Sequence, residues 1–212
     1  MKTIRAPTIG RLHELAVQAV LKYGDEIYTE DNDLTLEIAD PLCLECPSIG
    51  IDYRISDKSS IKEDFMEKYM KCLIEGYDET VNFEYDYHTR LFNYNDVINQ
   101  IDDIIVPKLK QSPQTRRACA ITWIPTIDGN LHDCPCLQWL NFDIRNDKLN
   151  LTVLFRSNDM LLAAGANMYA LTGLQSYVAE KLGNIDLGMY RHISCHPHIY
   201  VNRDKDELKK FL

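Results

Sequence analysis

The residues with the clearest chemical potential lie in the C-terminal half of the chain, beginning at Cys136. This cysteine follows Pro135 and precedes a segment, 137–142, whose apolar residues alternate as in a half-buried strand. A cysteine at such a junction can expose its sulfur, and nearby arginines would lower its pKa toward the nucleophilic thiolate. The alternative is a buried cysteine that acts as a small hydrophobe, and the residue type alone favours that alternative.

Two groups of arginines could bind a phosphate. Arg156 and Ser157 stand where a predicted strand ends and a predicted helix begins, so a guanidinium, a hydroxyl and backbone N–H groups coincide. A solvated arginine beside an N-cap serine is the ordinary interpretation of the same pair. Arg116 and Arg117 precede another predicted strand, and in a chain of net charge −9 they form a second concentrated basic point.

One amide lies on a face that should be buried. Asn167 recurs with Leu171, Leu174 and Val178 at intervals of four, three and four residues, which places it on the core-facing stripe of a helix. A buried carboxamide must find hydrogen-bond partners. Either the protein or the edge of a ligand supplies them, and the residue alone favours the protein.

A structural zinc site is a competing interpretation of the cysteines and histidines. Cys43 and Cys46 have the spacing of a chelating pair, and 132–136 and 195–198 hold further donors. No second Cys-x-x-Cys pair occurs, and Cys-Pro-Cys at 134–136 is a poor chelating spacing. We therefore expect packing cysteines and no metal. Glycine loops of the Walker and Rossmann types are absent from the sequence.

The apolar pattern predicts the elements that must position these groups. Thr8 and Asn95 are expected to cap helices, and Leu208 and Phe211 could dock the charged tail. In chain order we expect a helix at 9–23, a turn at 25–33, a strand at 34–38, a strand near 49–55, a helix at 61–76, an aromatic loop at 77–94, a helix at 97–109, a strand at 118–126, a hairpin of 136–144 with 149–156, a helix at 157–183 and a strand region at 187–200.

The order of these elements defines the fold class. Helices and strands mix without a strict βαβ rhythm, which favours a large mixed sheet with packed helices over a Rossmann pattern. We therefore expect a single α+β domain spanning 1–212.

Composition excludes several classes of partner. There are 23 basic and 32 acidic residues, so the overall field repels nucleic acid and anionic membranes. No apolar run approaches the roughly 20 residues that span a bilayer, and the first residues lack the apolar core of a signal peptide. Seven cysteines, an odd number, indicate a reducing compartment. We expect a cytoplasmic protein.

Taken together, these residues resemble the thymidylate synthase and pyrimidine nucleotide hydroxymethylase superfamily, in particular short archaeal thymidylate synthase-like proteins. The resemblance runs from about Gln100 to Tyr200, and before Gln100 it fades to Tyr85 and Arg90. It implies a three-layer fold with a divergent part at 1–95. Its landmarks are T-R-R at 115–117, A-I-T-W at 120–123, P-C at 135–136, R-S-x-D at 156–159, Asn167, and H-x-Y at 198–200.

The resemblance implies a reaction and a homodimer. Cys136 would attack carbon-6 of a pyrimidine nucleotide, after which carbon-5 would accept a one-carbon unit from a methylene-tetrahydropterin. Arg156 and Ser157 would hold the nucleotide phosphate. Arg116 and Arg117 would reach the same phosphate from the partner subunit.

Other positions would bind the rest of the nucleotide. Asn167 would read the base edge, Asp159 would offer its backbone to the base, and His198 with Tyr200 would bond the sugar hydroxyl. An asparagine can donate and accept, so it matches the carbonyl and N–H edge of uracil, whereas an aspartate would favour cytosine. The expected substrate is therefore dUMP.

Several residues depart from the superfamily pattern and leave rivals open. Leu137 stands where histidine is common, Phe155 where glutamine is usual, and His196 where the motif has aspartate. The pattern's longer C-terminal region, which closes over folate, is not matched, so a modified pterin would fit as well as tetrahydrofolate. The rivals are a dCMP or CMP hydroxymethylase on the same scaffold, and a non-catalytic nucleotide-binding or zinc-stabilised module.

Overall fold

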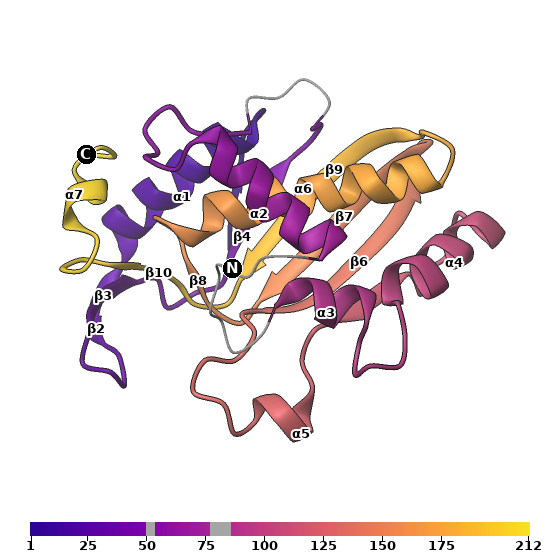
Figure 1. Ribbon diagram of the computed structural model, residues 1–212. Helices are drawn as coiled ribbons and strands as arrows, with labels where there is room; N and C mark the ends of the chain where they lie inside the picture. The colour runs from indigo at the N-terminus through magenta and orange to yellow at the C-terminus, as the bar shows by residue number, and fades with distance from the viewer. Residues whose placement is uncertain (50–53, 77–85) are drawn as a thin grey trace.

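The computed structural model describes residues 1–49, 54–76 and 86–212, which fold around two β-sheets (Figure 1). The six-stranded sheet contains, in spatial order, β1 (Lys2–Arg5), β4 (Leu42–Cys46), β9 (Asp186–Ser194), β7 (Lys148–Phe155), β6 (Leu137–Arg145) and β5 (Cys119–Ile121). The four-stranded sheet contains β2 (Asp25–Tyr28), β3 (Leu34–Glu37), β10 (Pro197–Tyr200) and β8 (Asn158–Asp159). Each sheet combines parallel and antiparallel pairs, as predicted for a large mixed sheet.

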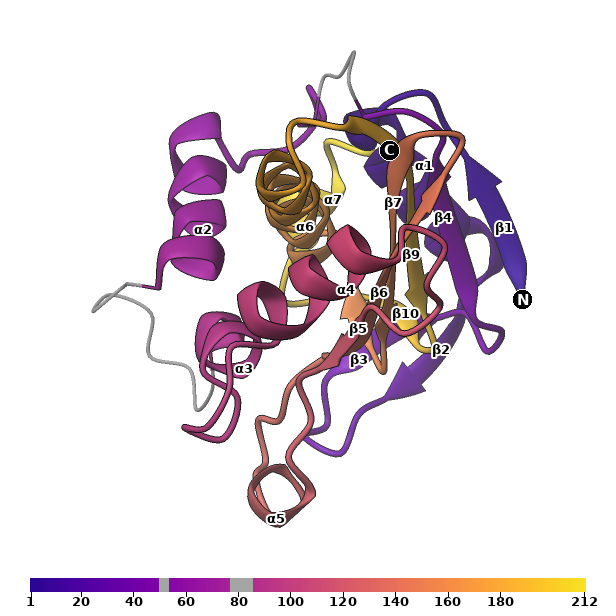
Figure 2. The same cartoon turned by 90° about the vertical axis from the view of Figure 1, so that its right-hand side faces the viewer.

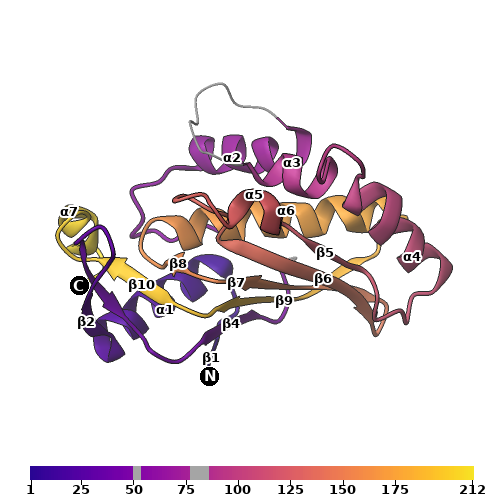
Figure 3. The same ribbon diagram turned by 90° about the horizontal axis from the view of Figure 1, so that it is seen from below.

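The helical segments of the described residues are α1 (Ile9–Tyr23), α2 (Glu63–Glu75), α3 (Tyr87–Phe92), the π-helical η1 (Gln100–Ile105), α4 (Val106–Gln111), α5 (Pro125–Asp128), α6 (Ala163–Lys181) and α7 (Lys205–Leu208). α6 packs against β7, β9 and α2, and α1 packs against α6, β1 and β4. Figures 2 and 3 show α2, α3, α4 and α6 on one side of the large sheet.

Strand register shows how the large sheet is covered. Leu44, His192 and Val153 are direct neighbours on β4, β9 and β7, so they share one face, and all three are fully buried. On the opposite face the neighbours Arg191 and Thr152 remain partly exposed. One face of the sheet therefore forms the main core under α1 and α6. The predicted third layer stays a prediction.

The first helix follows the sequence pattern closely. The side chain of Thr8 accepts a hydrogen bond from the backbone N–H of Arg11, so it caps α1 as predicted. Gly24 ends the helix, and its N–H bonds to the carbonyl oxygen of Val20. Leu208 and Phe211 are buried, so the tail docks as predicted.

Other predicted elements were wrong at their boundaries. The predicted turn at 25–33 begins with β2, and the predicted aromatic loop contains α3. Asn99, not Asn95, accepts the capping hydrogen bond, from the N–H of Asp102, and Val97 is 79 % exposed. The strand predicted at 118–126 contains only three residues before α5, and the helix predicted from Ser157 begins at Ala163, after β8. Tyr85 and most of the strand predicted near 49–55 lie outside the described residues.

The two cysteines with chelating spacing lie in a strand that the sequence pattern did not predict. Cys43 and Cys46 are both buried in β4. Residues three apart on a strand point to opposite faces, so their sulfurs cannot bind one metal ion together. Within the described ranges, no helix is both long and apolar enough to cross a membrane.

A buried histidine makes the fold sensitive to acid. His192 is fully buried on β9 and stacks on Phe155 with 4.5 Å between ring centroids, and burial lowers the pKa of His192 to about 3. This pKa lies below the unfolded value of 6.5, so between these values the unfolded chain binds the proton and stability falls as the pH falls.

We predict that acidification from pH 7.5 to pH 5 lowers the free energy of unfolding of both proteins, and that the decrease is about 2 kcal/mol larger for the wild type than for His192→Phe. Urea unfolding of both proteins at both pH values measures the difference. Equal losses in the two proteins would show that His192 is not the acid-sensitive group.

Candidate active site

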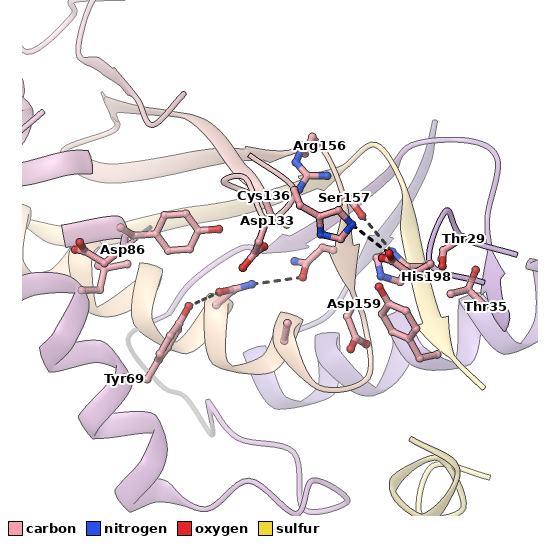
Figure 4. A pocket seen from close by; sticks show the side chains of 18 of the residues that line it. Thr29, Thr35, Tyr69, Asp86, Asp133, Cys136, Arg156, Ser157, Asp159 and His198 are labelled. Carbon is pink, nitrogen blue, oxygen red and sulfur yellow. Dashed lines mark hydrogen bonds and ion pairs between the residues drawn. The ribbon is translucent and has the colours of Figure 1, made fainter. Parts of the chain in front are cut away.

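A cleft of about 1110 Å³ lies where the ends of β7, β8 and β10 meet α2, α3 and α6. Seven of the nine residues predicted to form the site line it, and they come from segments more than sixty residues apart in sequence (Figure 4). The seven are Cys136, Arg156, Ser157, Asp159, Asn167, His198 and Tyr200.

Arg156 holds the turn that carries Cys136. Its Nε donates to the carbonyl oxygen of Pro135 at 3.1 Å, and its Nη2 donates to that of Cys134 at 2.8 Å. Its backbone N–H donates to the carbonyl oxygen of Cys136 at 2.8 Å. Arg156 therefore bonds to three successive carbonyl groups. Because a guanidinium has five N–H donors, others remain for a ligand.

Further bonds fix the turn from its other side. The N–H of Leu137 donates to the hydroxyl of Tyr87 on α3 at 3.0 Å, and Gln138 Nε2 donates to the carbonyl oxygen of Pro135 at 2.5 Å. The β6–β7 register shifts between Leu137 and Trp139, and such a bulge re-aims the side chains beside it. Cys136 is half-buried and lines the cleft.

Ser157 and His198 meet across the smaller sheet. The Oγ of Ser157 lies 3.3 Å from Nδ1 of His198, and the same nitrogen lies 3.1 Å from the carbonyl oxygen of His196. A carbonyl oxygen can only accept, so Nδ1 carries the proton and Nε2 is left as an acceptor. Tyr200 follows two residues later on the same face of β10, with ring centroids 5.1 Å apart.

Asp159 is held on both sides of its carboxylate. Its Oδ1 accepts from the N–H groups of Leu161 and Leu162, and its Oδ2 accepts from Arg203 at 2.9 Å. Burial raises the pKa of Asp159, while these partners partly offset the effect. The guanidinium of Arg203 also lies over the Tyr200 ring, 3.7 Å from its centroid. Burial raises the pKa of Tyr200.

Asn167 is buried as predicted, and the protein supplies part of its hydrogen bonding. Its Oδ1 accepts from the hydroxyl of Tyr69 at 2.9 Å, and its Nδ2 donates to Oδ1 of Asn158 at 3.4 Å. These bonds use two of the amide's four hydrogen-bonding positions. Since Asn167 lines the cleft, one donor and one acceptor remain for a ligand.

Arg116 and Arg117 do not line the cleft of their own chain. Both are exposed on the segment before β5, the edge strand of the large sheet. This position neither brings them to the other seven residues nor prevents them from reaching another subunit.

Sequence reasoning missed several cleft residues, namely Tyr69, Tyr87, Asn158 and Arg203. Asn158 lies inside the R-S-x-D motif and could have been noticed there. Nothing local distinguishes Arg203 from the other charged residues of the tail. Arg203 is brought to the cleft by its contacts with the Tyr200 ring and the Asp159 carboxylate.

The departures from the superfamily pattern have physical explanations. Leu137 and Phe155 face each other across β6 and β7, and both are fully buried in the core. His196 is exposed, and its Nδ1 lies 2.7 Å from a carboxylate oxygen of Glu37. Two of these positions therefore serve packing, and the third serves a contact at the rim of the cleft.

Comparison with known proteins points to one family. The family model described as "Thymidylate synthase" matches residues 55–212. The chain is 39 % identical over 219 residues to a protein of Methanocaldococcus jannaschii, covering 100 % of this chain and 96 % of the relative. It is 37 % identical over 200 residues to a protein of Methanosarcina barkeri, covering 94 % and 89 %. Both relatives are named "Putative thymidylate synthase".

The chain therefore belongs to the thymidylate synthase family. The likeness reaches further toward the N-terminus than the sequence motifs indicated, because the family model begins at residue 55 and the relative from M. jannaschii matches the whole chain.

A buried ion pair links α3 to α5. Arg90 on α3 donates to Asp128 on α5 at 2.6 Å, and both side chains are almost fully buried. The other carboxylate oxygen of Asp128 accepts from the N–H of Ile124. Arg90 Nη1 has no hydrogen-bond partner among the described residues. Removing the aspartate would leave a buried, uncompensated guanidinium.

We predict that Asp128→Ala lowers the free energy of unfolding by about 3–5 kcal/mol. Replacing both partners, as in Arg90→Met with Asp128→Ala, should recover part of that loss, because no charge is then stranded. Urea unfolding of the single and double variants gives the coupling energy. A loss below about 1 kcal/mol for Asp128→Ala would place the pair among weak surface contacts.

Proposed function

We propose that this chain is a thymidylate synthase that converts dUMP to dTMP with a reduced methylene-pterin as carbon donor. The observation that carries the proposal is the contact between Arg156 and the Cys136 turn, in a cleft shared with Asn167 and His198. Family membership supports the reaction class. Cys136 is the nucleophile that attacks carbon-6 of the pyrimidine, which makes carbon-5 nucleophilic.

The fixed position of Arg156 serves the nucleophile and the substrate together. A guanidinium beside a sulfur stabilises the negative charge of the thiolate. The N–H groups of Arg156 that do not bond the turn are available to the nucleotide phosphate, with the hydroxyl of Ser157 beside them. The position of the phosphate and the position of the attacking sulfur are then set by one side chain.

The remaining nucleotide contacts come from β8, α6 and β10. Asn167 bonds the uracil edge. His198 and Tyr200 bond the sugar hydroxyl, and His198 Nε2 can accept a hydrogen bond from it. β8 is an edge strand whose ladder uses the N–H groups of Asn158 and Met160, so the N–H of Asp159 points away from β10. That direction suits a backbone contact to the base.

The cleft also suits a pterin beside the nucleotide. Its volume of about 1110 Å³ exceeds the ~300–1,000 Å³ usual for one ligand. Asp86, Asp133 and Asp159 present carboxylates, which accept from the N–H groups of a reduced pterin ring. When bound, the pterin supplies the carbon and the final hydride. Tetrahydrofolate and a modified tetrahydropterin both present this N–H edge.

A homodimer would complete the phosphate site. The described residues that line the cleft include two arginines, Arg156 and Arg203, and six carboxylates, so one chain offers little net attraction to a dianion. Arg116 and Arg117 are exposed and can act on a second chain. Packing of the large sheet's less covered face against its copy would also supply the third layer of the fold.

We predict that Cys136→Ala lowers tritium release from carbon-5-labelled dUMP by at least about a thousandfold, because no adduct can form at carbon-6. The assay uses methylene-tetrahydrofolate or a modified methylene-tetrahydropterin, with labelled dCMP in parallel.

Cys134→Ala is the matched control, since its sulfur lies in the same turn but its side chain is not among the described residues that line the cleft. This variant should retain tritium release. Retained release in Cys136→Ala would overturn the proposal. Chromatography of the product separates methyl transfer from the hydroxymethyl transfer of the rival enzyme.

We also predict that the arginines act on the partner's site. Arg116→Ala with Arg117→Ala should abolish activity, and so should Cys136→Ala. Because each mixed dimer then has one complete site, subunit exchange between the two inactive proteins should restore up to about a quarter of wild-type activity. A mixture that stays inactive, although exchange is verified by mass spectrometry, would exclude sharing of the arginines.

A further inference from the structure

Five polar side chains form a continuous hydrogen-bonded chain beneath the floor of the cleft. His192 Nδ1 lies 3.0 Å from the hydroxyl of Tyr190, and His192 Nε2 lies 2.8 Å from Nδ2 of Asn158. Asn158 Oδ1 accepts from Asn167 Nδ2, and Asn167 Oδ1 accepts from Tyr69. Tyr190, His192 and Asn158 are at most 2 % exposed. The hydroxyl of Tyr69 points into the cleft (Figure 4).

Every link in this chain depends on the next. Asn158 donates to Nε2 of His192, so Nε2 carries no proton and the proton of the neutral ring is on Nδ1. With its Nδ2 turned toward His192, Asn158 presents Oδ1 to Asn167. Asn167 must then turn Nδ2 toward Asn158 and Oδ1 toward Tyr69. The opposite tautomer of His192 would reverse both amides.

The orientation of the Asn167 amide decides which pyrimidine fits it. In the observed orientation a donor lies on the Asn158 side and an acceptor on the Tyr69 side. Uracil presents a carbonyl oxygen beside an N–H, whereas cytosine presents an amino group beside a bare ring nitrogen. The two bases therefore require opposite amide orientations at the same place.

We propose that His192, which lies outside the cleft, is a specificity-determining residue that selects uracil by fixing Asn158 and, through it, the amide of Asn167. The proposal rests on the proposed function, in which Asn167 reads the base. His192 touches neither nucleotide nor pterin, so it acts as a positioning residue. Burial lowers the pKa of His192 to about 3, so the ring stays neutral near neutral pH. The contact with Asn158 then selects its tautomer.

Two substitutions at Asn158 separate orientation from mere damage. Asn158→Asp keeps an acceptor toward Asn167, so the amide of Asn167 should keep its orientation whichever tautomer His192 adopts. Asn158→Leu keeps a similar size but removes the acceptor, so that amide is free to turn. His192→Phe keeps the stacking on Phe155 and releases Asn158 instead.

The measurement is the ratio of dUMP to dCMP affinity, by calorimetric titration of the full-length protein. Wild type and Asn158→Asp should prefer dUMP by on the order of ten- to a hundredfold, as a two-bond base contact provides. Asn158→Leu and His192→Phe should bind the two nucleotides within a few-fold of each other. General damage would weaken both nucleotides alike and leave the ratio unchanged, which would overturn the inference.

Two further readouts keep the inference testable. Nitrogen NMR of the wild type should show His192 with Nδ1 protonated and Nε2 unprotonated, and the opposite tautomer would overturn it even if Asn158→Leu fails to fold. Asn167→Asp should switch the preference to dCMP. If the switch occurs but His192→Phe stays selective, only the inference fails. If wild type binds neither nucleotide, the proposed function fails with it.

Discussion

The hydrogen bonds from Arg156 to the turn before β6 are the interaction on which the site depends. One side chain at the end of β7 bonds to the carbonyl groups of Cys134 and Pro135, and its own N–H bonds to that of Cys136. A half-buried guanidinium needs acceptors, and the turn at this point presents the carbonyl groups of Cys134 and Pro135 to it. The guanidinium donors and the carbonyl acceptors thus satisfy each other. The cation that can attract a phosphate is thereby fixed relative to the sulfur.

The order of strands explains why distant residues meet there. β7 lies between β6 and β9 in the large sheet, so the residues that follow β7 emerge beside those that precede β6 and those that follow β9. The chain then continues as β8 and pairs with β10 in the smaller sheet. Arg156, Cys136 and His198 are thus brought together by register, and α6 places Asn167 on the adjacent wall.

The sequence predicted those parts that local patterns determine. The helix at 9–23 and the hairpin with its turn at Asn146 and Asp147, both of positive φ, follow from periodicity and turn chemistry. β4 was missed because its strand character comes from pairing with β1 and β9, for example of Cys43 with Ile193 and of Cys46 with Tyr190, which no local pattern shows. Likewise, the seven cleft residues were identified by motif, whereas Arg203 and His192 acquire their roles only from tertiary contacts.

The proposed function places opposite demands on the charge at the two ends of the cleft. An acidic protein that binds a nucleotide must concentrate its few cations where the phosphate lies, yet the described residues that line this cleft include six carboxylates. Under the proposed function these carboxylates would suit the N–H groups of the pterin and oppose the nucleotide phosphate, so the two ends of the cleft would need opposite electrostatics. Arginines from a second chain would separate these needs, because they add positive charge at one end only. The neutral chain from His192 to Asn167 would meet a related need, since it would direct an amide at the base without adding any charge to the site.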